Sequence, residues 1–343
     1  MKNTLLCLAV VLFTALSALS QSVADYNSSV EYYNSGNLKR QKGDLEGAIA
    51  DYNKAIQFNP NNSDAYVNRG LTRKDKGDLD DAIADETRAI EIKPNDGDAY
   101  SGRGTIKDDK GDSDGAIADF EKAIALNPDD AEAFYYRGNA KNHKGDLDGA
   151  MADYTKAIAL KPDRADIYFN PYFNRAATKS AKGDLDGAIA DLNKHIALRP
   201  DDARAYFDRG VHKRDKNDLE GALADFNKAI QLNPNKSLYY SSRATAKSKK
   251  GDMDGALADS SKAIELKPSE DAYYNRGQIY YDSQDFVHSL SDFRKAVETD
   301  SSDDYAHFRV WIIRARLGEK KRQPRNFKTI STIERPESLM IGR

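Results

Sequence analysis

Two kinds of charged residue recur through this sequence at fixed places, and both are types that can take part in proton transfer or bind ions. We expect instead that each arginine meets an aspartate across its own or a neighbouring helix pair, where a partly buried pair would tolerate the loss of neither partner. The alternative is that both are solvated surface charges, worth about 0–1 kcal/mol per pair. The aspartates are Asp51, Asp85, Asp119, Asp153, Asp191, Asp225, Asp259 and Asp292, and the arginines are Arg69, Arg103, Arg137, Arg175, Arg209, Arg243 and Arg276.

No other residues form a pattern typical of catalysis or of ligand binding. The recurring Gly-Asp pairs fit turns and helix caps better than phosphate-binding loops. No nucleophile stands beside an oriented base. We therefore expect no catalytic residue, no cofactor and no metal site. The histidines share neither a repeat place nor a ligand spacing and are predicted to be surface or packing residues: His143, His195, His212, His288 and His307.

The charged places belong to a longer repeated unit. The stretch 42–60 returns with small changes along most of the chain, and its closing proline recurs every 34 residues apart from one gap of 38, between Pro162 and Pro200. A fixed period of this length predicts a solenoid, in which each unit contacts only its neighbours. The hydrophobic content of 39% suits many small interfaces better than one large core.

Each unit reads as two antiparallel helices. In the stretch 42–60, Gly43 permits a tight turn, Asp44 suits the N-cap, and Asn59-Pro60 ends the helix. The residues before the Gly-Asp turn form a first helix with an aromatic four residues ahead of a small residue, which places both on one face. The apolar face of the second helix follows the 3.6-residue period through Leu45, Ala48, Ile49, Tyr52, Ala55 and Ile56.

These residues carry a family resemblance. Tyr32, Gly36, Ala48, Tyr52, Ala55 and Pro60 in the first unit, and Tyr66, Gly70, Ala82, Ala89 and Pro94 in the second, resemble the tetratricopeptide repeat. The resemblance implies an all-α, right-handed α-solenoid of helix-turn-helix repeats with a C-terminal capping helix. We count eight repeats over 29–302, at about 29–62, 63–96, 97–130, 131–168, 169–202, 203–236, 237–269 and 270–302, and then the capping helix over 303–317.

The chain departs from the family pattern in ways that make its first helices unusually polar. The recurring arginines stand where the family usually has a leucine. Glu86 and Ser260 replace an aromatic residue of the second helix, and His195 replaces its second alanine. The second aromatic of the first helix is replaced by Arg73, Lys107, Lys141, Lys179, Lys213 and Lys247.

The 38-residue gap contains a four-residue insertion that repeats Tyr-Phe-Asn. Asn170 and Pro171 suit the N-cap and first position of a helix, so the first helix of the fifth repeat begins there. The alternative is a helix that begins near Asp163 and kinks at Pro171.

Both ends of the chain differ from the repeats. Residues 1–20 have the layout of a signal peptide, with Lys2, an apolar run and small residues, and cleavage is expected after Ser20 or Ala24. The sole cysteine, Cys7, would be removed with it. Residues 318–343 are predicted to be a disordered basic tail. The net charge of −3 combines +6 over 310–343 with −9 over the rest, which does not favour a nucleic-acid surface.

The resemblance implies a non-enzymatic scaffold that binds a partner peptide or helix in the concave groove lined by the first helices. The alternative is a structural component of an envelope assembly that uses its convex face or tail; an enzyme or glycan binder is not favoured. We expect an exported protein, periplasmic or extracellular, with no stable membrane span after cleavage. The predicted groove residues are Asp64, Val67, Leu71, Lys74, Asp98, Ser101, Thr105, Asp108, Tyr135, Asn139, Asn142, Phe173, Phe207, Val211, Arg214, Tyr274, Gln278 and Tyr281.

Overall fold

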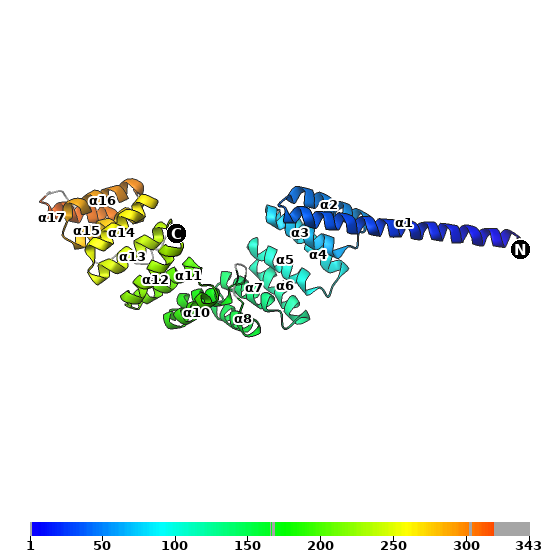
Figure 1. The fold of residues 1–343 in the computed structure, drawn as a ribbon, viewed down its shortest axis with the longest axis horizontal. Coiled ribbons are helices and arrows are strands. Elements are labelled where there is room, and N and C mark those ends of the chain that lie inside the picture. The colour runs from blue at the N-terminus through cyan, green and yellow to red at the C-terminus, as the bar shows by residue number, and fades with distance from the viewer. Residues whose placement is uncertain (1, 165, 167–168, 302–303, 319–343) are drawn as a thin grey trace. The chain divides into compact units, whose positions relative to one another are not determined.

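The computed structural model describes residues 2–164, 166, 169–301 and 304–318, with side chains described from residue 20 onward. These residues fold into α-helices that divide into two compact units, 1–164 and 165–343. Each unit is a stack of antiparallel helix pairs, the arrangement of an α-solenoid (Figure 1). In the described part of the chain, no helix combines the length and apolarity needed to cross a membrane.

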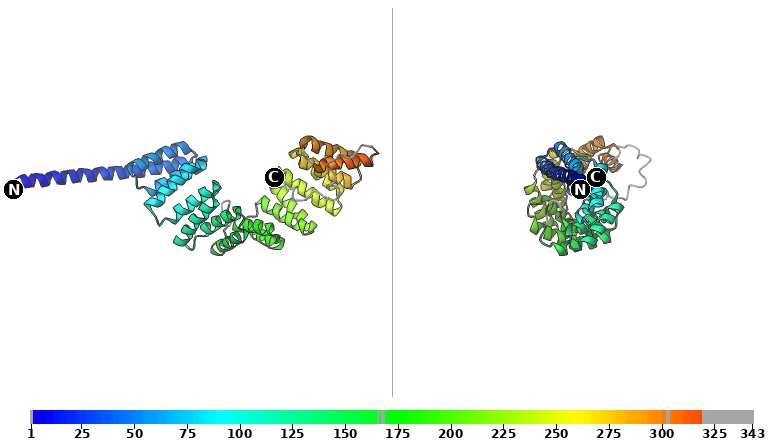
Figure 2. Two further views of the ribbon diagram at one scale, coloured as in Figure 1. Left: turned by 180° about the vertical axis from the view of Figure 1, so that it is seen from behind. Right: turned by 90° about the vertical axis from the view of Figure 1, so that its right-hand side faces the viewer.

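Unit 1 contains four helix pairs. Its first helices are α1 (Lys2–Gln41), α3 (Ser63–Lys76), α5 (Gly97–Asp109) and α7 (Ala131–His143). Its second helices are α2 (Leu45–Phe58), α4 (Leu79–Ile92), α6 (Ser113–Leu126) and α8 (Leu147–Leu160). The N-terminal part of α1, which includes the predicted signal segment, projects beyond the helix stack (Figures 1 and 2).

Unit 2 contains four further pairs and a last helix. The first helices are α9 (Pro171–Ala181), α11 (Ala203–Asp215), α13 (Ser237–Lys250) and α15 (Glu270–Asp282). The second helices are α10 (Leu185–Leu198), α12 (Leu219–Leu232), α14 (Met253–Leu266) and α16 (Phe286–Thr299), and α17 (Asp304–Arg316) packs on α16. Helix α9 begins at Pro171, the first of the two alternatives for the insertion, although Asn170 makes no side-chain cap bond. Of the predicted tail, only residue 318 is described.

The turn inside each pair follows the sequence prediction. Gly43 has a φ of +79°, a conformation that glycine adopts without steric cost. The Asp44 Oδ1 then accepts a hydrogen bond of 2.9 Å from the Gly47 N–H and caps α2. Equivalent aspartates cap most other second helices: Asp112, Asp146, Asp184, Asp218, Asp252 and Asp285.

The core consists of small alanine contacts plus one larger side chain per pair. Two alanines on most second helices, such as Ala116 and Ala123, have almost no exposed surface, which lets neighbouring backbones approach closely; His195 takes the place of one on α10 and Ser289 of one on α16. The larger side chain fills the space between them, as Phe120 does in the third pair. We call this place the ring position; it is occupied by Tyr52, Glu86, Phe120, Tyr154, Leu192, Phe226, Ser260 and Phe293.

Candidate functional site: the inner face of the first helices

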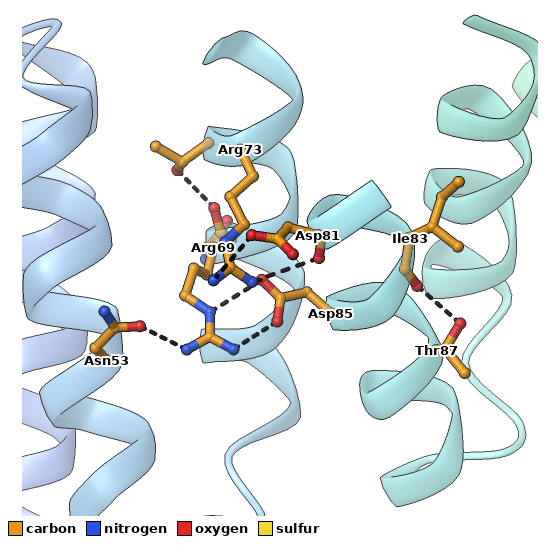
Figure 3. A network of polar contacts seen from close by, with 9 residues as sticks. Asn53, Arg69, Arg73, Asp81, Ile83, Asp85 and Thr87 are labelled. Carbon is orange, nitrogen blue, oxygen red and sulfur yellow. Dashed lines mark hydrogen bonds and ion pairs between the residues drawn. The ribbon is translucent and has the colours of Figure 1, made fainter. Parts of the chain in front are cut away.

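The recurring arginines and aspartates form buried ion clusters, as Figure 3 shows for the second pair. Arg69 on α3 donates from Nε to Asp85 Oδ2 at 2.9 Å and from Nη2 to Asp85 Oδ1 at 2.5 Å. Arg73, one turn later, donates from Nη1 to the same carboxylate at 2.6 Å. Asp85 is only 3% exposed, so the two cations replace the water that its charge has lost.

The same geometry returns in all seven pairs that carry the arginine, which confirms the pairing predicted from the sequence. The Arg Nη2–Asp Oδ1 distances run from 2.5 to 2.8 Å. A lysine one turn after the arginine completes five of these clusters at 2.7–2.9 Å. We call each set of Asp, Arg and second cation an ion cluster. The pairs are Arg69–Asp85, Arg103–Asp119, Arg137–Asp153, Arg175–Asp191, Arg209–Asp225, Arg243–Asp259 and Arg276–Asp292.

The ion clusters also join neighbouring repeats. Besides its aspartate, Arg69 donates from Nη1 to Asn53 Oδ1 of α2 at 2.6 Å (Figure 3). Arg209 and Arg243 make the same bond, at 2.7 Å, to an asparagine of the preceding second helix. Because these guanidinium groups are fully engaged by the chain itself, their role is to hold the stack together.

The first helices form the inner layer of each unit. Successive first helices contact one another, as α3 and α5 do, in addition to their second helices, and the second helices of neighbouring pairs do not contact one another to the same extent. The layer whose members lie closer together is the inner side of a curved stack.

Polar contacts, among them two ion pairs, link the first helices of unit 1 along this inner layer. Arg40 Nη2 of α1 lies 3.0 Å from Asp75 of α3, and Lys74 of α3 lies 2.9 Å from Asp109 of α5. Next along the stack, His143 Nδ1 of α7 lies 3.0 Å from Asp108 Oδ2 of α5. These contacts connect neighbouring first helices across the inner layer.

A pocket of about 440 Å³ opens between α1 and α3 beside the first of these pairs. All the residues that line it are of polar types, and they include two asparagines and a glutamine. Asn37 accepts a hydrogen bond from the Tyr52 hydroxyl, and Asn68 donates one to the Tyr33 hydroxyl, so both amides are held in place. The lining residues are Asn37, Arg40, Gln41, Asn68 and Asp75.

A second pocket, of about 570 Å³, lies at the edge of unit 1 between the loop 93–98 and the end of α6. Its wall contains Asp96, Asp98 and Asp130. Partial burial and the negative charges of Asp96, Asp130 and Glu132 raise the pKa of Asp98 above its ordinary value. A positively charged partner group here would relieve that repulsion.

The inner layer of unit 2 combines aromatic and charged groups. The Arg204 guanidinium lies 5.1 Å from the ring centroid of Phe173, and its Nε is 3.7 Å from Asp208 Oδ2. Burial is the main cause that raises the pKa of Asp208 to about 6, with Arg204 acting in the opposite direction. Below them, the fully buried His195 lies 2.8 Å from Asp202, the cap of α11, and packs against Phe173. His195 is thus one of the predicted packing residues.

The structure places the eighteen predicted groove residues in three settings. Asp64 and Asp98 are exposed. Eleven lie half-buried on the first helices: Val67, Leu71, Lys74, Ser101, Thr105, Asp108, Asn139, Asn142, Phe173, Gln278 and Tyr281. Several of these already contact neighbouring elements, as Asp64 does through Lys93 at 2.7 Å.

The other five predicted residues are buried inside the stack. Their large side chains turn between the helices. Phe207 stacks on Tyr239 with centroids 4.9 Å apart, and Tyr274 packs edge-on against Phe293 at 5.0 Å. The five are Tyr135, Phe207, Val211, Arg214 and Tyr274.

The sequence reasoning missed several inner-face residues. Asn37 and Arg40 occupy in the first repeat the places of Leu71 and Lys74, and Asn68 occupies a first-helix place that the predicted groove set does not include. The sequence distinguishes Asp208 from its counterparts. Other repeats hold Asn68, Gly102 or Ser242 at its place, so the carboxylate is a local exception.

In the ranges that the structure describes, no group of three or more histidine, cysteine, aspartate or glutamate side chains is arranged to hold a metal ion. A search of curated proteins gives no significant match. Three family models, described as TPR repeat or tetratricopeptide repeat, match the chain: one over residues 36–77, one over 102–165 and 173–237, and one over 63–96 and 270–303. Together the matched segments cover well over half of the sequence. The chain is a tetratricopeptide-repeat protein.

Two solved structures with TM-scores above 0.5 share its fold. The C-terminal part of a TPR repeat-containing protein from Cytophaga hutchinsonii is 20% identical, with a TM-score of 0.58 over 70% of this chain and 98% of that one. A chain of the APC/C hetero-tetramer Cut9-Hcn1 is 16% identical, with a TM-score of 0.53 over 78% of this chain and 52% of that one. MamA is 29% identical over 52% of this chain and 94% of that one, with a TM-score of 0.44. At these identities the first two likenesses show the fold alone.

Proposed function

We propose that this tetratricopeptide-repeat scaffold holds an extended segment of a partner protein against the inner face of its first helices. The observation that carries the proposal is the polar pocket between α1 and α3, which opens on that face. Asparagine and glutamine side chains both donate and accept hydrogen bonds, so Asn37, Gln41 and Asn68 suit the peptide groups of an extended chain.

The charges of the two units indicate which side chains such a partner carries. In unit 1 the crowded carboxylates around Asp98 favour a lysine or arginine of the partner. In unit 2 the half-buried Phe173 and the recessed Asp208 favour an apolar or aromatic side chain beside a basic one. Neither region has a set of groups arranged for a chemical step, so a non-enzymatic role is the function they support best.

Site-specific photo-cross-linking tests the proposal. A photoreactive residue at Gln41 or Asn68 should cross-link to a partner protein, and the same residue at Lys122, exposed on the second helix α6, should not. The partner captured from both inner positions must be the same protein. Cross-links that arise only from Lys122, or binding that is lost on deleting residues 318–343 and insensitive to inner-face changes, would favour the alternative scaffold that uses its outer face or tail.

We also propose that the protein is exported and acts in a periplasm or outside the cell. The proposal rests on the signal-like sequence of residues 1–20. Mass spectrometry of the protein recovered from the envelope or medium should give an N-terminus at Gln21 or Asp25. Recovery of the full-length chain from the cytoplasm alone would contradict it.

A further inference from the structure

One buried side chain has no bonding partner that would account for its burial. Glu86 occupies the ring position of the second pair and has no exposed surface. Neither of its carboxyl oxygens has a hydrogen-bond partner within the part of the chain that the structure describes. A carboxylate in such a place would lose its hydration without compensation, which is among the most costly arrangements in a folded protein.

Two glycines leave room for the Glu86 carboxyl group. Its Oε1 lies between the first helix of its own pair and that of the next: a Cβ placed on Gly70 would be 3.3 Å from it, and one on Gly102 would be 3.1 Å from it. The other first helices described carry a larger side chain at the place of Gly102, such as Asn68 or Tyr136. Glycine at 102 therefore removes the side chain that would press on Glu86, and the carboxyl group lies at the junction of α3, α4 and α5.

The charges around Glu86 do not favour its ionised form. Asp85 on α4 and Asp96 before α5 are negative and oppose it, and Arg103 on α5 favours it. Arg103 is committed to Asp119, which it bonds at 2.9 and 2.7 Å, and Asp85 is bonded by Arg69 and Arg73. Burial is the largest cause, and together with the two aspartates it raises the pKa of Glu86 from its ordinary 4.5 to about 8.

We propose that Glu86 is a proton-dependent joint between the second and third repeats: the junction of α3, α4 and α5 is firm when Glu86 is protonated and is weakened when Glu86 ionises. The folded chain binds the proton more tightly than the unfolded chain, so stability is fully present below the unfolded pKa and is lost as pH rises through the folded pKa. The unfolding constant of unit 1 should rise by up to about tenfold for each pH unit between about 5 and 8, and then level off. Helices α3 and α5 both line the inner face. The protonation state of Glu86 therefore controls how stably these helices pack in that face, whether or not a partner binds there.

Two measurements on the full chain test this inference. The first is carbon-13 NMR of protein labelled at the glutamate Cδ, with the Glu86 signal identified by its loss in Glu86→Gln. We expect a titration midpoint near pH 8. A midpoint near 4.5 would overturn the proposal.

The second measurement is urea unfolding of unit 1 between pH 5 and 9. Glu86→Gln, which keeps the shape and removes the ionisation, should flatten the pH dependence, and Glu91→Gln on the same helix should leave it as in the wild type because Glu91 is exposed. Glu86→Phe, which places the phenylalanine of the third repeat at this position, keeps the test available if the glutamine variant does not fold. Parallel pH profiles for the wild type and both Glu86 variants would contradict the inference.

Discussion

Two neighbouring positions on each second helix face the interior of the stack, the aspartate position and the ring position. The residue type is constant at the first and varies at the second. An aspartate stands at the same place in all eight pairs, and in seven of them it is bonded by an arginine, whereas the ring position ranges from Phe120 and Tyr154 to Leu192, Ser260 and Glu86. Removing the aspartate of an ion cluster is strongly destabilising, because its cations then stay buried without a counter-charge. A ring position tolerates change when its neighbours adjust: Gly102 makes room for Glu86, and the Ser260 hydroxyl bonds the Ala256 carbonyl of its own helix at 2.8 Å.

We expect the largest loss in the free energy of unfolding from a substitution at a ring position that holds an aromatic side chain. Phe226 is fully buried against Phe207 and the glycine of its first helix. Phe226→Ala should lower the free energy of unfolding of unit 2 by about 4 kcal/mol because it leaves a cavity. Ser260→Ala, at the same place in the next repeat, should change it by less than about 1 kcal/mol. Urea unfolding measures both changes. Equal losses would mean that the ring position contributes equally to stability in both repeats.

A smaller loss is expected from an ion cluster. Asp119→Ala leaves Arg103 and Lys107 without their carboxylate, and these cations are about four-fifths buried. We expect a loss of about 3 kcal/mol in the free energy of unfolding of unit 1.

Asp80→Ala is the matched control for the ion cluster. Asp80 is paired with Lys110 at the exposed edge of the same repeats, so its removal should leave unfolding unchanged. If both aspartate variants behave alike, the buried cluster holds no more of the stack together than a surface pair does.

The smallest effect concerns a carboxylate that belongs to neither class. Asp208 has a pKa of about 6, raised mainly by burial, so its contribution to stability is lost as pH rises from about 4 to about 6. Its side chain keeps 30% of its exposure, and solvent therefore reduces the effect. Asp208→Asn should be more stable than the wild type by roughly 1 kcal/mol at pH 7 and equal to it at pH 4. Thermal melts at the two pH values check this, and an equal difference at both would show that the charge is not the cause.

The features that recur in phase along the repeats could be predicted from the sequence. The period, the caps such as Asp44 and the partner of each arginine follow from residues that return in phase. The exposure of individual inner-face residues does not follow, because it depends on which neighbour fills a gap. Phe207 is buried because Tyr239 stands where other repeats have an alanine and stacks on the Phe207 ring. Glu86 is accommodated because Gly102, on the first helix of the next repeat, has no side chain to fill that space.

The central claim is that the repeated charges build the stack and that the inner face binds the partner. The most direct test measures, by calorimetry, the affinity for the partner that photo-cross-linking identifies. Two variants are compared, Gln41→Arg in the pocket between α1 and α3 and Lys122→Glu on α6, and urea unfolding is measured for each. We predict that Gln41→Arg weakens binding at least about tenfold with unfolding unchanged, and that Lys122→Glu alters neither. Wild-type affinity in Gln41→Arg together with weakened binding in Lys122→Glu would contradict the account.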